Sequence, residues 1–204
     1  MNDRCGWCGT DPLYVDYHDT EWGVPETGSR ALFEKLILDG FQAGLSWLTI
    51  LRIRVAFRAA FAGFDPAVIA EWGPSQVDVL LQDSGIVRHR GKIEAAIRGA
   101  RAWQVIEARQ GFSRFLWTYV DGSPLQPHRA TAQDVPGLTP LSQRIAKDLA
   151  TAGFGFCGPT IVYAFMQAVG MVNDHVVTCR CHAPLVERAR SRASLPGIGA
   201  GGEP

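Results

Sequence analysis

The chain reads Gly153-Phe154-Gly155-Phe156-Cys157-Gly158-Pro159-Thr160 at the point where two segments of helical periodicity meet. Glycine permits a tight turn and lets the backbone approach a partner closely. A helix that begins near Thr160 would offer free N–H groups, which favour an anion. A helix, a glycine hairpin and a second helix can hold a DNA phosphate without reading sequence, although a plain turn between two helices is commoner. Gly155, Gly158 and Thr160 are therefore candidate phosphate contacts.

Helical patterns continue on both sides of this hairpin and predict an all-α fold. Apolar residues recur with a helical period, and capping residues such as Ser29, Asp65 and Thr139 precede several segments. No segment alternates between apolar and polar residues as a half-buried strand does. The expected helices run from Ser29 to about Gly40 and over 47–61, 66–72, 75–84, 92–107, 113–119, 140–152 and 160–169.

Two segments that combine Cys and His lie at opposite ends of the chain. Cys5 is followed by His18 near the N-terminus, and His175 is followed four residues later by Cys179. On a helical turn, residues four apart point the same way, as two ligands of one metal must. A zinc ion shared by segments 5–18 and 175–179 would join the two ends of the chain as a clasp.

Other interpretations of these cysteines stay open from spacing alone. Cys5 and Cys8 with Cys179 and Cys181 form a competing ligand set, and a redox Cys-x-x-Cys is a third possibility. Isolated cysteines are also commonly small buried hydrophobic residues. A zinc ion with four protein ligands keeps no open coordination position, so such an ion would be structural.

The composition suits a single globular domain. Of 204 residues, 47% are hydrophobic, which allows a sizeable core and excludes disorder for most of the chain. We expect one domain over 1–190 and a disordered tail over 191–204, where Arg, Ser, Gly and Pro dominate. No apolar run suits a membrane span and no signal core follows the N-terminus. We therefore expect no membrane association and a cytoplasmic setting, and we expect a monomer.

The balance of charges excludes a global attraction to nucleic acid. Lys and Arg together number 20, as do Asp and Glu. DNA binding would need a local patch, for which Arg88-His89-Arg90-Gly91-Lys92 is a candidate, although a solvated helix start is the commoner explanation.

Aromatic residues concentrate in the first quarter of the chain, beside polar residues and outside clear helical periodicity. Such rings can stack on a planar ligand, although each ring taken singly is more often part of a core. Asp39 ends an apolar stripe just before Gly40, so we expect its carboxylate to face a pocket at that helix end. The rings are Trp7, Tyr14, Tyr17, Trp22 and Trp47.

Six segments, in order along nearly the whole chain, carry a family resemblance. They read Arg4-Cys5-Gly6-Trp7, Asp11-Pro12-Leu13-Tyr14, Tyr17-His18-Asp19-x-Glu21-Trp22-Gly23-Val24-Pro25, Gln42-Ala43-Gly44-Leu45-Ser46-Trp47, Gly85-Ile86-x-Arg88-His89-Arg90-Gly91-Lys92-Ile93 and Val172-Asn173-Asp174-His175-Val176-Val177. This series resembles DNA-3-methyladenine glycosylase I, an all-helical family of the helix-hairpin-helix glycosylase superfamily with a structural zinc ion. The resemblance implies that fold, no organic cofactor, and one zinc ion held by Cys5, His18, His175 and Cys179.

The resemblance also implies an activity: excision of 3-methyladenine from alkylated double-stranded DNA by hydrolysis of the N-glycosidic bond, without a lyase step. Such an enzyme must flip the nucleotide into a pocket. N3-methylated adenine is cationic, and a ring face attracts a cation by about 0.5–2 kcal/mol. We expect Trp47 to stack on the base, Tyr17 to form the opposing wall and Asp39 to accept from the exocyclic amine. Trp7, Tyr14 and Trp22 are further base-binding candidates.

Two positions depart from the patterns of the family and superfamily. The family typically has glutamate where this chain has Asp39, which is one methylene shorter, so the pocket must close up or a water must bridge the gap. Asn173 stands where many relatives in the superfamily have a catalytic aspartate, with Asp174 next to it. A cationic base is already a good leaving group, so we expect little need for that carboxylate.

Contacts to DNA follow from the same resemblance. The hairpin would hold a phosphate, with Arg88, Arg90 and Lys92 as further contacts. In the turn around Gly44, Leu45 would wedge into the gap left by the flipped nucleotide and Gln42 would probe the orphaned base. Ordinary core packing of Leu45 is an equally good expectation.

Two other functions remain open at this point. One is a non-catalytic binder of alkylated DNA on the same scaffold, which release of free 3-methyladenine would exclude. The other is a zinc hydrolase, which needs an open metal position that two Cys and two His ligands would not leave.

Overall fold

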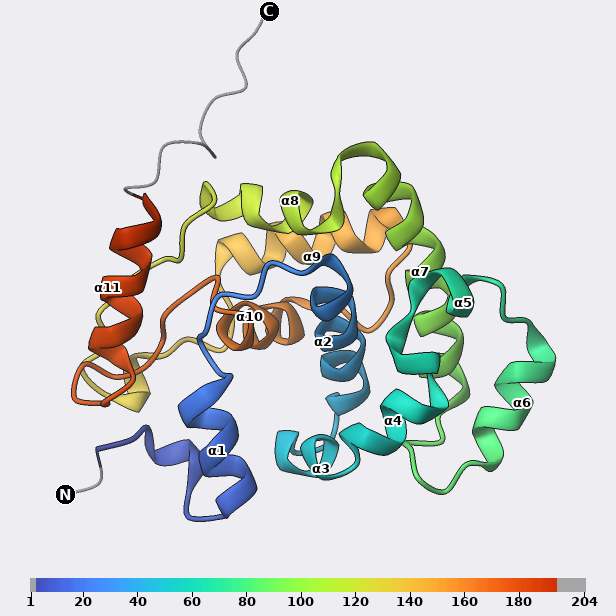
Figure 1. Cartoon of the computed structure of the whole chain (residues 1–204), viewed down its shortest axis with the longest axis horizontal. Helices are drawn as coiled ribbons and strands as arrows, with labels where there is room; N and C mark the ends of the chain where they lie inside the picture. Colours follow the sequence, from blue (N-terminus) through green and yellow to red (C-terminus); the bar gives the residue numbers. More distant parts are fainter. Residues whose placement is uncertain (1–2, 194–204) are drawn as a thin grey trace, which may run out of the picture.

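The computed structural model describes residues 3–193, and every regular element in that range is a helix, which confirms the all-α prediction (Figure 1). The α-helices are α1 (Pro12–Thr20), α2 (Ser29–Gln42), α3 (Trp47–Arg52), α4 (Arg54–Ala60), α5 (Pro66–Ala70), α6 (Pro74–Gln82), α7 (Arg90–Gln110), α8 (Phe112–Trp117), α9 (Pro140–Ala152), α10 (Pro159–Ala168) and α11 (His182–Ala193). Short 3-10 helices lie at Gly6–Cys8, Ala62–Phe64, Thr118–Val120 and Ala132–Asp134.

Helices α9 and α10 form the hairpin that the glycine-rich stretch predicts. The Thr139 hydroxyl accepts from the Ser142 amide at 3.1 Å and caps α9, which ends at Gly153 with a φ of 112°. The hairpin packs closely on α7, because a Cβ atom built on Gly155 would lie 2.9 Å from the Cβ of Ala95. Glycine is therefore required at position 155 by helix packing.

Helix α2 runs through the middle of the molecule and packs against α3, α7, α8 and α10 (Figure 1). The predicted apolar stripe is buried, with Leu32, Phe33 and Leu36 fully covered. Burying each such side chain stabilises the fold by about 1.5–3 kcal/mol. Because α2 is anchored in this way, residues near its C-terminal end hold fixed positions inside the protein.

Several expected helix boundaries differ from those observed by one to three residues, and two differences change the architecture. The helix expected over 47–61 is divided at Ile53, whose φ of −106° and ψ of 10° interrupt the helix between α3 and α4. Ser29 does not cap α2, because Gly28 is the N-cap. The Ser29 hydroxyl accepts from the Ser113 amide at 3.2 Å and so joins α2 to α8.

The C-terminal region differs more from expectation. His175 and Cys179 lie in a non-helical turn, so their side chains converge through that turn and not through helical spacing. Helices α1 and α11 have no counterpart among the expected helices: α1 carries Tyr14 and Tyr17, which were expected outside helical periodicity, and α11 continues through Ser191 into the region expected to be a tail. Residues 194–204 of that expected tail lie outside the described range.

The N-terminal segment meets the segment that precedes α11 at one side of the molecule, where α1 and α11 are both found (Figure 1). The Arg180 amide donates to the Asp3 carbonyl at 2.8 Å. The segment after α1 also crosses the end of α10: a Cβ atom on Gly170, whose φ is 70°, would lie 2.5 Å from the Pro25 nitrogen. None of the described helices is both long and apolar enough to cross a membrane.

Candidate functional site

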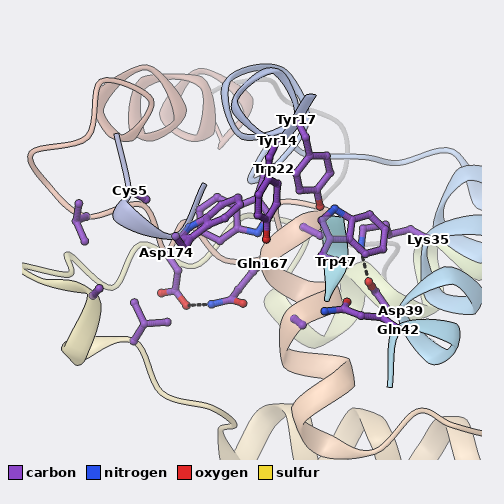
Figure 2. Close-up of a pocket in the computed structure, with 16 residues that line it drawn as sticks. Cys5, Tyr14, Tyr17, Trp22, Lys35, Asp39, Gln42, Trp47, Gln167 and Asp174 are labelled. Atoms are coloured by element: carbon purple, nitrogen blue, oxygen red, sulfur yellow. Dashed lines mark hydrogen bonds and ion pairs between the residues drawn. The ribbon is translucent and has the colours of Figure 1, made fainter. Parts of the chain in front are cut away.

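A cavity of about 370 Å³ opens between α1, the C-terminal half of α2, the first turn of α3, and α10 (Figure 2). This volume lies within the range of roughly 300–1,000 Å³ that is typical of small-molecule sites. The sequence-predicted residues that line it are Trp7, Tyr14, Tyr17, Trp22, Asp39, Gln42 and Trp47. The structure thus brings the five predicted rings and the predicted carboxylate together around one cavity.

The rings pack mainly edge to face, an arrangement that the charge distribution of aromatic rings favours. The ring centroids of Trp7 and Trp22 are 5.0 Å apart at 65°, and those of Tyr17 and Trp47 are 5.4 Å apart at 46°. Tyr17 is 3% and Trp47 7% exposed. Trp47 Nε1 has no hydrogen-bond partner among the described residues, so it is an unused donor.

Asp39 lies in the cavity wall with an exposure of 1% and forms an ion pair with Lys35, one helical turn earlier on α2 (Figure 2). Burial raises the pKa of the Asp39 carboxyl, and the adjacent Lys35 ammonium opposes that rise. Asp39 Oδ2 has no partner in the described part of the chain. A buried acceptor of this kind is costly unless a ligand or water satisfies it.

Lys35 is a residue of this cavity that the sequence reasoning missed. Its Nζ lies 3.8 Å from the centre of the Trp47 ring, and burial lowers the pKa of the ammonium. The spacing of four residues between Lys35 and Asp39 places both side chains on one face of α2. That spacing is the signal that could have revealed the pair.

Asp174 lines the far side of the cavity from Asp39 (Figure 2). Its carboxylate accepts hydrogen bonds from Arg129 Nε at 3.0 Å, the Tyr163 hydroxyl at 2.5 Å and Gln167 Nε2 at 2.9 Å. Asn173 is buried, and its amide nitrogen donates to Gln126 Oε1 at 2.9 Å. The carboxylate at this end of the cavity is therefore neutralised and fully engaged.

Beside the cavity, four buried side chains from the two ends of the chain form a cluster suited to a metal ion. The ligand atoms of Cys5, His18, His175 and Cys179 all lie within 4.8 Å of one another. Cys179 Sγ is 3.3 Å from His175 Nδ1 and 3.6 Å from His18 Nε2. Two thiols and two imidazoles are a donor set that a tetrahedral zinc ion prefers.

The remaining histidine nitrogens are oriented by further partners, as is usual for metal-binding histidines. His18 Nδ1 is 2.8 Å from Asp19 Oδ1, and His175 Nε2 is 3.1 Å from the Trp22 carbonyl oxygen. The Trp22 ring also packs edge to face on His175, with centroids 4.5 Å apart. The cluster thus positions one wall of the aromatic cavity.

The competing set of four cysteines is not brought together. Cys8 Sγ donates to the Cys5 carbonyl oxygen at 3.1 Å and faces the backbone. Cys181 lies near Asp19, with 3.9 Å from its Sγ to Asp19 Oδ1. The geometry favours the ligand set that the family resemblance implies.

The residues expected to contact DNA lie in different environments in the structure. Leu45 is 43% exposed, so core packing is excluded, and Gly44 beside it has a φ of 86°. Gly158 and Thr160 are exposed at the hairpin. Arg90 is exposed but pairs with Asp78 at 2.6 Å. These placements leave phosphate contact by the hairpin and by the basic segment as expectations.

Lys92 is not at the surface, where a DNA-contacting residue was expected. It is 7% exposed, and its Nζ donates to the carbonyl oxygens of Phe41 at 2.9 Å and Ala43 at 2.7 Å. The ammonium satisfies carbonyls at the C-terminal end of α2, where a cation is favourable. Lys92 therefore supports the α2–α3 turn and is not on the surface to contact a phosphate.

Fold and cavity together define a helical hairpin protein with an aromatic pocket sized for a planar small molecule. The family model for methyladenine glycosylase matches residues 7–182, and the chain belongs to this family. DNA-3-methyladenine glycosylase 1 of Escherichia coli (strain K12) is 49% identical over 181 residues, which cover 88% of this chain and 97% of that protein.

Solved structures agree with this membership. A crystal structure of 3-methyladenine DNA glycosylase I superposes with a TM-score of 0.86 at 52% identity, covering 88% of this chain and 99% of the other. A Tyr-to-Phe variant of 3-methyladenine DNA glycosylase I, in complex with 3-methyladenine, gives a TM-score of 0.86 at 38% identity, with coverage of 89% and 98%.

Proposed function

We propose that this chain flips a 3-methyladenine nucleotide out of alkylated double-stranded DNA and hydrolyses its N-glycosidic bond, leaving an abasic site without cutting the strand. The observation that carries the proposal is the cavity lined by Trp47 and Tyr17, whose rings pack against each other at 5.4 Å, in which one buried carboxylate oxygen of Asp39 has no partner among the described residues. Family membership supports the same activity.

The pocket suits a methylated purine for three physical reasons. The face of Trp47 provides a stacking surface for a cationic ring. Asp39 Oδ2 is free to accept a hydrogen bond from the exocyclic amine. Because the side chain is fixed inside α2, this acceptor is held in place before the base arrives. The short side chain of Asp39 would reach the base directly if the base binds deep in the cavity, next to α2.

The chemistry makes modest demands on the protein. As the bond between C1′ and N9 breaks, its electron pair moves onto the base, which leaves as neutral 3-methyladenine. Positive charge develops on the sugar, and a water molecule adds its oxygen to C1′ and releases a proton. Asp174 is neutralised by Arg129, so it does not offer an unpaired charge to the sugar. The charge of the leaving base therefore provides most of the driving force.

We propose that the hairpin and the Gly44 turn hold the DNA. We propose that the amides around Gly158 and Thr160 bind a phosphate, with Arg88 and Arg90 adding positive charge. The exposed Leu45 would fill the gap left by the flipped nucleotide, and Gln42 at the cavity edge would face the orphaned base.

We further propose that the Cys and His cluster holds one structural zinc ion. Cys5, His18, His175 and Cys179 would supply four ligands, which leaves no position for a metal-bound water. The bound ion would lock the aromatic wall through the contact of Trp22 with His175. We keep the expectations of a monomer and of a cytoplasmic setting, where reduced thiols remain available as ligands.

The decisive experiment uses duplex DNA treated with a methylating agent. Chromatography of the released bases should show free 3-methyladenine, with abasic sites left in uncut strands. A protein that retards methylated DNA in gel-shift assays but releases no base would instead be the non-catalytic binder.

A further inference from the structure

Lys35 introduces a positive charge into a pocket that is built to receive one. Its Nζ lies 3.8 Å from the centre of the Trp47 ring and pairs with Asp39, so it stands beside the two groups expected to hold the base (Figure 2). The side chain is 16% exposed and reaches the cavity wall from α2. This ammonium is part of the pocket and not of the protein surface.

Other charged groups near this pair are already matched. Arg54 and Glu21 form an ion pair at 2.6 Å, and Arg58 and Glu34 another at 2.7 Å, both on the α4 side of Lys35. Across the cavity, Asp174 pairs with Arg129. Among the described residues that line the cavity, both carboxylates therefore have a cationic partner, and the lining together with Arg129 behind it has no net charge.

We propose that Lys35 determines the charge specificity of the base pocket: by neutralising Asp39 it prevents the pocket from over-stabilising the cationic base before the glycosidic bond breaks. This inference rests on the proposed excision of a cationic base. It assigns Lys35 a function in the balance between binding and bond cleavage, while Asp39 supplies the acceptor.

Positive charge moves from the base to the sugar as the glycosidic bond breaks. The methylated base is positive in the bound ground state and neutral after it leaves, while the positive charge passes to the sugar. A lone carboxylate beside the base stabilises the ground state more than the transition state, so it tightens binding and slows cleavage. An ammonium at the same place repels the cationic base, and this repulsion is relieved as the bond breaks. The neutral Lys35–Asp39 pair keeps the hydrogen-bond acceptor of Asp39 without over-stabilising the bound cationic base.

The first test compares four versions of the pocket, which carry three different net charges, with two free ligands as probes. One ligand is neutral 3-methyladenine, and the other is 3,9-dimethyladeninium, which is permanently cationic because a methyl group replaces the sugar at N9. Dissociation constants are compared across a pH series for the native chain, Lys35→Met, Asp39→Asn and the double variant that combines both changes. The series is needed because burial raises the pKa of the Asp39 carboxyl and lowers the pKa of the Lys35 ammonium.

The preference for the cationic ligand over the neutral one should follow the charge of the pocket. It should rise about tenfold in Lys35→Met, fall about tenfold in Asp39→Asn and return towards the native value in the double variant. An equal gain in affinity for both ligands in Lys35→Met would mean that Lys35 acts only through its volume. An unchanged preference for the cationic ligand would mean that the Lys35 charge does not affect ligand binding. Either result overturns the proposal.

The second test is single-turnover excision from methylated duplex DNA. Lys35→Met should lower the cleavage rate constant and also lower the protein concentration needed for half-saturation, the signature of a relieved ground-state penalty. A loss of folding would instead lower the affinity for both ligands. The matched control is Lys147→Met, which removes an exposed lysine from α9.

The two proposals fail in different ways. If the native chain releases no 3-methyladenine, the proposed function fails, whatever the ligand preferences are. If the native chain is active and Lys35→Met cleaves as fast as the native chain, only the inference about Lys35 fails.

Discussion

The Sγ atom of Cys5 lies 3.5 Å from Nδ1 of His175, although 170 residues separate them along the chain. Both side chains are buried, and both neighbour the aromatic residues of the cavity. A contact over so long a separation is entropically costly to form, and a shared metal ion would offset that cost.

The first prediction concerns this clasp. Elemental analysis should find one zinc ion per purified chain. Its removal by a chelator, or the substitution Cys179→Ala, should lower the midpoint of thermal unfolding by about 10 °C or more, because several kcal/mol of metal binding are lost. The control Cys8→Ala alters a thiol that faces the Cys5 carbonyl, so it should keep the metal. Full zinc content in Cys179→Ala would refute the ligand assignment.

The second prediction compares two glycines of the hairpin. Gly155→Ala should destabilise the fold by about 1–3 kcal/mol, because its Cβ would meet Ala95 at 2.9 Å. A Cβ on Gly158 meets no atom within 4 Å, and the φ of −65° suits alanine. Gly158→Ala should therefore unfold at the native temperature. If its amide region holds a phosphate, this variant should bind duplex DNA several-fold more weakly and bind free 3-methyladenine normally.

The third prediction concerns the exposed turn at Leu45. Leu45→Ala should leave thermal stability unchanged, because the side chain is not in the core. Excision from duplex DNA should fall about tenfold, since the variant cannot fill the gap left by the flipped nucleotide. Val55→Ala, which changes a side chain 77% exposed on α4, is the control and should behave like the native chain. A wild-type rate for Leu45→Ala would argue against the wedge.

The fourth prediction compares two basic residues of one segment, Arg88 and Lys92, one exposed and one buried. Lys92→Met should lower stability by about 1–3 kcal/mol, because two carbonyl oxygens lose their buried donor. Arg88→Ala, at an exposed position, should leave stability intact. If Arg88 contacts a phosphate, the slope of log affinity against log salt concentration should decrease by about 1. The salt titration of Lys92→Met should keep the native slope.

Much of this architecture could be predicted because local signals agree with tertiary packing. The Thr139 cap and the glycines of the hairpin predict α9, α10 and the turn between them. The apolar stripe of α2 predicts burial around Phe33. The five rings and Asp39 could be grouped through the family resemblance, and the structure places them around one cavity.

The rest depends on contacts between distant segments. Nothing local distinguishes the surface position of Arg88 from the buried position of Lys92, because the partner carbonyls of Lys92 belong to α2 and the following residue. The division between α3 and α4 at Ile53 results from the non-helical φ and ψ angles of that one residue, which the periodicity of the sequence does not reveal. The pairing of Lys35 with Asp39 was visible in the spacing, but its position over Trp47 depends on the α2–α3 turn.

The central claim is that Trp47 stacks on a flipped, cationic base. The most direct measurement is the release of 3-methyladenine from methylated duplex DNA by the native chain, Trp47→Phe and Trp47→Ala, with thermal unfolding recorded for each. Trp47→Phe should keep activity to within about tenfold, because it retains a ring face, whereas Trp47→Ala should lose about 100-fold or more. A folded Trp47→Ala variant that releases the base at the native rate would contradict this account.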